Sequence, residues 1–207
     1  MRVSSRVRAL LGLAALFALA GSAASAPRRA VGAYPGLPKV EIKTDYGPIV
    51  IALETKRAPI TAGNFLKYID AHRFDGTTFY RAARIAGRPG MGLVQGGIDT
   101  DITKSFFPIA HEPTTKTGLR HTDGTVSMAR NKPGSAMGNF FIVLGAAPGL
   151  DAKGEYPGYA AFGHVVSGMD VARKILEQPT FPGGLSLQTM GQTLRKPVKI
   201  VSTRRLP

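Results

Sequence analysis

Cysteine and tryptophan are both absent from the 207 residues of this chain. Without cysteine there are no disulfide bonds, thiolate nucleophiles, cysteine-bound zinc sites or iron–sulfur clusters. Long hydrophobic runs are also missing, because the longest strongly apolar stretch, residues 9–20, has 12 residues, whereas a membrane-spanning helix needs about 20. The chain must therefore work without sulfur chemistry and without a spanning helix.

Acidic residues are scarce: 13 Asp and Glu stand against 27 Lys and Arg, a formal net charge of +14. Such a charge favours anionic partners. The basic residues are scattered, however, without the clustered basic runs that mark nucleic-acid sites. A solvated basic surface is the simpler interpretation, and we expect no nucleic-acid partner.

The first 26 residues have the layout of a secretory signal peptide. Arg2, Arg6 and Arg8 precede the apolar stretch, and small residues follow it up to Ala26. This order of charged, apolar and small segments is typical of export signals. We therefore predict cleavage after Ala24 or Ala26, a periplasmic or secreted protein with a net charge of +11, and no stable membrane insertion.

Residues 27–38 are rich in Pro and Gly and are interpreted as a linker. Residues 39–207 then form one domain, because this length permits a single sizeable core. The first strands are expected at 40–44 and 49–53, as a hairpin around the turn residues 45–48. A short amphipathic helix is expected from Pro59 to about His72.

Short β-rich pieces separated by Gly and Pro fill the middle of the chain. They lie at 77–81, 93–96, 125–129, 139–144 and 160–165, followed by a second short helix at 169–176 and a last strand near 198–203. Many short strands with one helix near each end predict a mainly β fold, a closed antiparallel barrel capped by two short α-helices.

The sequence lacks the signature motifs of several enzyme classes. The four histidines do not form a His-x-x-x-His pair, so no metal site is predicted. No Gly-x-Ser-x-Gly elbow and no dinucleotide-binding glycine pattern occur. A paired-carboxylate hydrolase is not favoured by the spacing of the acidic residues, which are by default surface or turn residues.

Six segments remain, rich in aromatic and hydrogen-bonding side chains but without an activated nucleophile. They are FDGTTFYR (74–81), VQGG (94–97), GTVSMAR (124–130), GNFFI (138–142), GLD (149–151) and YAAFGHVVSGMDVARKI (159–175). In this order they resemble the cyclophilin-type peptidyl-prolyl cis-trans isomerases, from about residue 40 to residue 203. The resemblance implies an eight-stranded antiparallel barrel with two helices, a proline-binding groove on its outer surface, and no cofactor.

The resemblance also implies roles for individual residues. Arg81 matches the catalytic arginine, which donates a hydrogen bond to the proline nitrogen as the imide twists. Gln95 matches the glutamine that supports this arginine, and Phe141 matches the aromatic floor of the proline pocket. Apolar walls are expected from Leu93, Met128 and Leu150, and further substrate contacts from Phe79, Ala129, Arg130, Asn139 and Tyr159.

Some residues depart from the family pattern. Asn139 stands in place of a second glutamine, Arg130 in place of an asparagine, and Tyr159 where many members have histidine. Gly149 replaces a tryptophan of eukaryotic members, and the segment 82–92 is longer than the compact family loop. Gly92, with Met91 beside it, stands where the family has a pocket phenylalanine.

Three hypotheses follow. The first is a monomeric peptidyl-prolyl isomerase that acts on proline-containing polypeptides during the folding of exported proteins. The second is a cyclophilin-like peptide-binding or chaperone module with weak or absent turnover, because of Asn139 and the altered loop. The third, from charge alone, is a basic envelope protein that binds anionic surfaces.

Overall fold

The barrel closes because its first and last long strands pair. The computed structural model describes residues 34–184 and 187–207. All strands belong to one antiparallel sheet in the order β1-β2-β7-β5-β6-β4-β3-β9-β8, and β1 also pairs with β9. The strands are β1 Lys39–Thr44, β2 Gly47–Leu53, β3 Thr78–Arg84, β4 Gly92–Gly97, β5 Thr125–Met128, β6 Asn139–Leu144, β7 Ala160–Ser167, β8 Thr180–Phe181 and β9 Thr193–Leu206. The closed eight-stranded barrel is thus confirmed, with the two-residue β8 added to the edge of β9.

The first hairpin forms as the turn residues predict. β1 and β2 pair in antiparallel register up to Thr44 and Gly47. The Thr44 hydroxyl closes the turn by donating to the Gly47 carbonyl over 2.7 Å. Val40, Ile42, Ile49 and Ile51 are fully buried. Alternation of apolar and polar residues along β1 therefore places one face of the hairpin inside the barrel.

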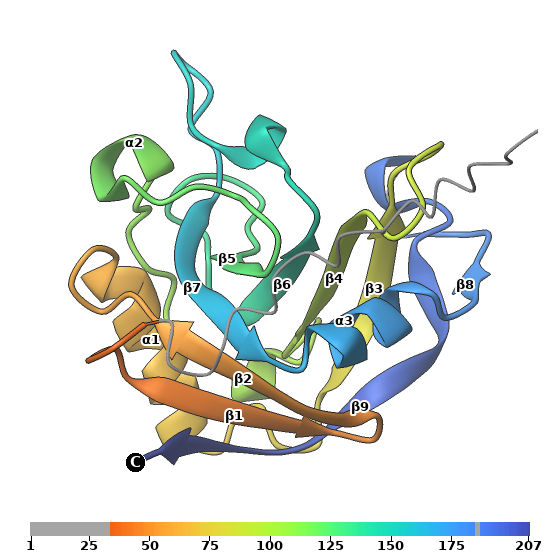
Figure 1. Cartoon of the computed structure of the whole chain (residues 1–207), viewed down its shortest axis with the longest axis horizontal. Helices are drawn as coiled ribbons and strands as arrows, with labels where there is room; N and C mark the ends of the chain where they lie inside the picture. The colour runs from red at the N-terminus through yellow and green to blue at the C-terminus, as the bar shows by residue number, and fades with distance from the viewer. Residues whose placement is uncertain (1–33, 185–186) are drawn as a thin grey trace, which may run out of the picture.

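Two helices cover the barrel from different sides (Figure 1). The helix α1, Pro59–Asp70, begins with proline in its first turn and packs on β7 and β9. The helix α3, Met169–Leu176, packs on β2, β3, β4 and β6. Both were expected. A third helix, the single turn α2 Thr114–Thr117, was not, because four residues are too few to show a helical period.

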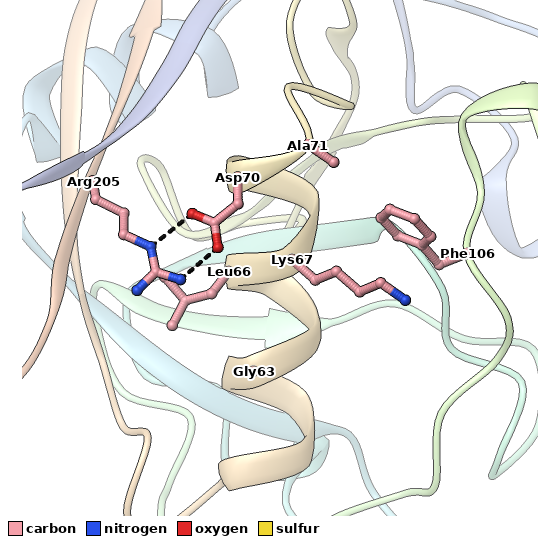
Figure 2. Close-up of a pocket in the computed structure, with 7 residues that line it drawn as sticks. All are labelled: Gly63, Leu66, Lys67, Asp70, Ala71, Phe106 and Arg205. Atoms are coloured by element: carbon pink, nitrogen blue, oxygen red, sulfur yellow. Dashed lines mark hydrogen bonds and ion pairs between the residues drawn. The ribbon is translucent and has the colours of Figure 1, made fainter.

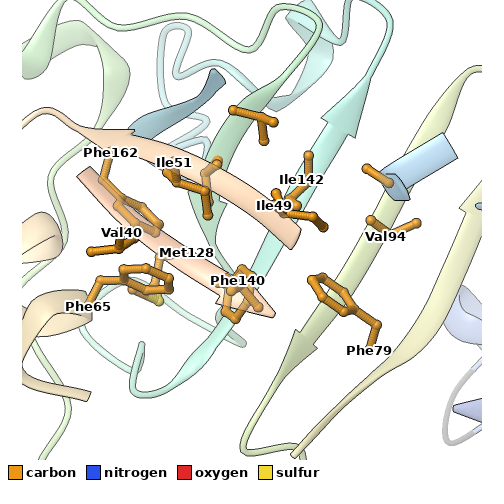
Figure 3. Packing of buried hydrophobic residues seen from close by; sticks show 14 of the residues in the cluster. Val40, Ile49, Ile51, Phe65, Phe79, Val94, Met128, Phe140, Ile142 and Phe162 are labelled. Atoms are coloured by element: carbon orange, nitrogen blue, oxygen red, sulfur yellow. The ribbon is translucent and has the colours of Figure 1, made fainter. Parts of the chain in front are cut away.

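Aromatic rings fill the interior (Figure 3). The ring of Phe65, from α1, lies 5.1 Å from that of Phe140 and 5.0 Å from that of Phe162. The ring of Phe140 also meets that of Phe79 edge-on, with centroids 5.6 Å apart. Each buried phenylalanine contributes about 1.5–3 kcal/mol from burial alone. This core gives the outer wall of the barrel a rigid backing.

The segment before β1 contacts the barrel. The ring of Tyr34 stacks on His164 with centroids 5.1 Å apart. The Pro38 carbonyl accepts a hydrogen bond of 2.9 Å from the Leu53 amide. Residues 34–38, the end of the expected linker, are therefore attached to β2 and β7. The predicted signal peptide and residues 27–33 lie outside the described residues.

Among the helices of the described residues, none is both long and apolar enough to cross a membrane.

Candidate active site

A β-bulge in β3 turns two consecutive side chains outward. Phe79 pairs with Gly96, and Arg81 pairs with the adjacent Gln95, so Tyr80 is the extra residue. Phe79 and Ala82 are buried in the core, whereas Tyr80 and Arg81 between them are partly exposed. A bulge changes the alternation of side chains in this way. As a result, a tyrosine and an arginine stand side by side on the outer face of the barrel.

Sheet register aligns the three predicted catalytic residues. Arg81 on β3 is opposite Gln95 on β4, and Gln95 is opposite Phe141 on β6. The row continues to Ser127 on β5, the partner of Phe141. Neighbouring residues in such a row lie on the same face of a sheet. Residues 60 positions apart in the sequence are thereby brought together.

These residues line a large cavity of about 1170 Å³ on the outside of the barrel. Nine of the predicted site residues border it: Arg81, Leu93, Gln95, Ala129, Arg130, Asn139, Phe141, Leu150 and Tyr159. The cavity is also bordered by residues of the segment that precedes β9: Phe181, Gly183, Gly184, Gln188 and Thr189. The cavity can therefore hold an extended peptide and not merely one side chain.

Two of the predicted substrate-binding residues lie elsewhere. Phe79 and Met128 are both buried in the core and do not border the cavity. Phe79 precedes the bulge and points inward. Met128 pairs with the core residue Phe140, so it shares the inner face with that ring. These residues were predicted at the site because they adjoin site residues in the sequence. Successive side chains of a strand point to opposite faces of the sheet, however, and these two point to the inner face.

The ring of Phe141 is fixed from two directions. Tyr159 meets it edge-on with centroids 5.5 Å apart, and His121 stacks behind it at 6.1 Å. Leu93 and Leu150 complete the apolar part of the cavity. Only 3% of Phe141 is exposed. The site thus has a preformed apolar floor rather than one that must assemble around a ligand.

Amide oxygens hold the guanidinium of Arg81. Its Nη1 donates to Gln95 Oε1 over 2.7 Å. Its Nε and Nη2 donate to Gln192 Oε1 over 2.8 Å and 2.6 Å. Gln95 is itself held, because its Nε2 donates to the Tyr80 hydroxyl over 2.7 Å. The guanidinium is therefore fixed at the edge of the apolar floor.

The positive charge of Arg81 has no carboxylate partner among the salt bridges of residues 34–184 and 187–207. Desolvation lowers the pKa of Arg81, but an arginine remains protonated in proteins. Burial also raises the pKa of Tyr80, so its hydroxyl stays neutral. The site presents a fixed cation whose hydrogen-bond partners are neutral amides.

Comparisons with known proteins identify the family of this chain. Residues 39–205 match the family model described as cyclophilin type peptidyl-prolyl cis-trans isomerase/CLD. The chain belongs to this family.

Individual relatives carry the same name. A peptidyl-prolyl cis-trans isomerase of Acinetobacter baylyi is 38% identical over 168 residues, which cover 80% of this chain and 84% of the relative. Peptidyl-prolyl cis-trans isomerase A of Dickeya dadantii is 36% identical, with 68% and 72% covered. A cyclophilin-type isomerase of Cryptosporidium parvum, whose structure was solved in the presence of the dipeptide Ala-Pro, has a TM-score of 0.62 at 20% identity, covering 82% of this chain and 99% of that one. The chain is accordingly an isomerase of this class, with a cyclophilin fold.

Asn139 is one departure from the family pattern, and its side-chain amide is hydrogen-bonded to the backbone of Asp99. Its Oδ1 accepts a hydrogen bond of 2.7 Å from the Asp99 amide, and its Nδ2 donates to the Asp99 carbonyl over 2.9 Å. The side chain still borders the cavity. It fixes the backbone of Asp99, a non-glycine residue with a φ of 50°, rather than presenting a free amide.

Arg130, the second departure, lies over Tyr159. Its guanidinium carbon is 4.8 Å from the ring centroid, and Nη2 donates to the Gly158 carbonyl. The neighbouring Ala129 amide donates to the Asn139 carbonyl over 2.8 Å. Arg130 therefore braces the Tyr159 wall of the cavity and adds a second positive charge to it.

Gly92 stands where the family has a pocket phenylalanine, and the structure has no room for a side chain at this position. Its φ is 154°, and a Cβ at this position would come within 2.1 Å of the Ala83 carbonyl oxygen. Met91 packs its side chain toward Gly145 instead of the cavity. The segment 82–92, expected to be a long loop, is shorter in the structure: β3 continues to Arg84 and β4 begins at Gly92, which leaves a loop at 85–91. The β3–β4 connection can take this path only with glycine at the start of β4.

Behind the floor lies a Ser–His–Asp arrangement. His121 Nδ1 is 2.7 Å from Asp151 Oδ1, and its Nε2 is 2.9 Å from Ser127 Oγ. The three side chains have the connectivity of a hydrolase triad. Ser127, the neighbour of Phe141 in the same row, is fully buried, however, so no substrate carbonyl can reach it. The arrangement supports the floor and is not a nucleophile.

A second, shallower hollow of about 440 Å³ lies beside α1 (Figure 2). The ion pair of Asp70 and Arg205 spans its edge, with Asp70 Oδ1 2.7 Å from Arg205 Nε. This contact lowers the pKa of Asp70. None of the predicted site residues borders this hollow. The larger cavity is the one that unites them.

No cluster of three or more His, Asp or Glu side chains that could hold a metal ion occurs in the described part of the chain.

Sequence reasoning missed Gln192, Tyr80 as a cavity residue and the His121 support. Gln192 is 111 positions from Arg81 and belongs to none of the six family-like segments. Tyr80 was recognised only as part of a motif, because the bulge that turns it outward has no clear sequence signal. His121, Ser127 and Asp151 were each visible, but no spacing rule joins them.

Proposed function

We propose that this chain accelerates cis–trans isomerisation of X-Pro bonds in exported polypeptides, with Arg81 stabilising the twisted imide. The observation that carries this proposal is the guanidinium of Arg81, held by amide oxygens at the edge of the apolar cavity. The proposal concerns the mechanism and the clients of an isomerase whose family is established above.

The chemistry follows from the imide bond. Resonance gives this bond a rotational barrier of about 18–20 kcal/mol. As the bond twists, the proline nitrogen becomes pyramidal and its lone pair can accept a hydrogen bond. A fixed donor beside that nitrogen stabilises the twisted state more than the planar one, which is catalysis by differential binding. No nucleophile and no cofactor are required.

The cavity suits a proline ring. Phe141, Leu93 and Leu150 offer an apolar floor and walls, and burial of the ring there favours binding. Arg81 stands one strand away from Gln95, which itself neighbours Phe141. A proline seated on the floor would therefore bring its imide nitrogen toward the guanidinium, which the amide oxygen of Gln95 holds in place.

Export is the natural setting of this activity. The first 26 residues have the pattern of a signal peptide. X-Pro isomerisation otherwise takes tens to hundreds of seconds and limits folding. Fractionation of cells and mass determination of the mature N-terminus test this part: a protein that begins at Ser25 or Pro27 outside the cytoplasm supports it, and an uncleaved cytoplasmic protein contradicts it.

Asn139 favours one alternative, a peptide-binding module with little turnover. Its amide is already bonded to Asp99, so one polar arm of the site is occupied. Two-dimensional exchange spectroscopy on a short Ala-Pro peptide separates the two functions. Faster cis–trans exchange with catalytic amounts of protein supports isomerisation, whereas peptide binding without faster exchange supports the alternative.

A further inference from the structure

We infer that Gln192 is a positioning residue for Arg81, which orients the guanidinium so that its remaining N–H groups face the bound imide. This inference rests on the proposed role of Arg81. It concerns a glutamine from the segment before β9, outside the row of residues that the sheet register brings together.

The contact between the two side chains is a fork. Nε and Nη2 of Arg81 both donate to Gln192 Oε1, over 2.8 Å and 2.6 Å. With the 2.7 Å bond from Nη1 to Gln95, three of the five N–H groups of a guanidinium are engaged. One N–H on Nη1 and one on Nη2 remain for a ligand. The two glutamines therefore determine which edge of the guanidinium is presented.

Gln192 is itself held at three atoms besides the oxygen that contacts Arg81. Its backbone amide donates to Thr189 over 3.1 Å, and its carbonyl accepts from the Ala82 amide over 2.8 Å, next to Arg81. Its side-chain Nε2 donates to the Gln188 carbonyl over 3.0 Å. Because Nε2 is engaged there, Oε1 must point to Arg81. The orientation of the amide is thus fixed before any ligand binds.

Such fixation matters for a catalytic hydrogen bond. A free arginine samples many rotamers, and ordering it during the reaction would raise the barrier. Gln95 alone would restrain only Nη1 of Arg81, and the guanidinium could still rotate about that hydrogen bond. The second contact, from the opposite edge, removes this freedom. Loss of Gln192 should therefore slow turnover much more than it weakens peptide binding.

The test compares two replacements of similar length. Both variants lose the Nε2 donor to Gln188, but Gln192→Met also removes the acceptor oxygen, whereas Gln192→Glu keeps an acceptor oxygen for Arg81. Gln178→Met is the matched control: Gln178 belongs to the same part of the chain and accepts a 3.0 Å hydrogen bond from Tyr46, but it does not border the cavity.

Exchange spectroscopy on an Ala-Pro peptide gives kcat and KM for each protein. We expect Gln192→Met to lower kcat about tenfold with KM within about twofold, since a hydrogen bond to a charged group is lost. Gln192→Glu should recover most of kcat, and Gln178→Met should match the parent. In an Arg81→Ala background, Gln192→Met should have no further effect.

A second readout reports on the arginine directly. The ¹⁵Nε–H resonance of Arg81 should exchange slowly with water in the parent and in Gln178→Met, and rapidly in Gln192→Met. An unchanged kcat and an unchanged resonance in Gln192→Met would overturn the inference while leaving the proposed function intact. A parent protein without isomerase activity would instead contradict the proposed function.

Discussion

Arg81 and Gln95 stand directly opposite each other on β3 and β4, and Nη1 of the arginine lies 2.7 Å from Oε1 of the glutamine. The pair exists because the bulge at Tyr80 turns Arg81 outward. Phe141 is the next residue in the same row. The geometry of the sheet, rather than a flexible loop, therefore sets the distance between the donor and the apolar floor.

Arg81→Lys tests whether a positive charge alone is sufficient. Lysine keeps the charge but lacks the planar fork that reaches both Gln95 and Gln192. We expect kcat/KM for an Ala-Pro peptide to fall by at least about tenfold, measured by exchange spectroscopy. Turnover equal to that of the parent would show that the charge, not the oriented donor, carries the effect.

Leu93→Ala tests the apolar wall. Leu93 borders the cavity, and its truncation removes apolar surface from contact with the proline ring. We expect KM to rise about tenfold or more with a smaller change in kcat, because even one methylene group in such a pocket is worth about 1–3 kcal/mol. Val201→Ala, at an exposed site on β9, is the control. Equal KM values for Leu93→Ala and the parent would place the proline elsewhere.

His121 makes stability depend on pH. Desolvation, only partly offset by the bond to Asp151, lowers the pKa of His121, so the folded state disfavours its protonation. Its contribution to stability is complete above the unfolded pKa of about 6.5 and decreases as the pH falls below that value, because the unfolded state then binds the proton more readily.

Urea unfolding at pH 7.5 and pH 5.0 checks this dependence. The parent should lose more stability between the two pH values than His121→Gln does. Contributions that both proteins share cancel in this comparison. A larger loss in His121→Gln than in the parent would reverse the assigned direction of the pKa shift.

Gly92→Ala tests the close approach of β3 and β4. The added Cβ would lie 2.1 Å from the Ala83 carbonyl oxygen, so the backbone must move. We expect the free energy of unfolding to fall by about 2 kcal/mol or more. Gly149→Ala, where a Cβ meets nothing within 4 Å, should change stability by about 0.5 kcal/mol or less. Equal stabilities of the two variants would contradict the steric account.

The fold was largely predictable because its signals are local. The hairpin at β1 and β2 and the helices α1 and α3 follow from alternation, turn residues and helical spacing. The family-like segments extended this to the closed barrel. The turn α2 and the two-residue β8 were not predicted, since elements this short carry no periodicity.

The main residues of the site were predictable from the sequence, but the directions in which some of their side chains point were not. Arg81, Gln95 and Phe141 border one cavity, as the motifs indicate. The inward turn of Phe79 and Met128 depends on a bulge and on strand register, which the sequence does not display. Gln192 could not be predicted from the sequence because its contact with Arg81 exists only after β3 and β9 have paired.

The most direct test of the central claim is the cis–trans exchange rate of an Ala-Pro peptide with the parent protein and with Arg81→Ala, after ¹H–¹⁵N spectra have shown that both are folded. The account predicts acceleration by the parent and a loss of about 100-fold or more in kcat/KM for Arg81→Ala, while the peptide still binds. Equal acceleration by both folded proteins would contradict it.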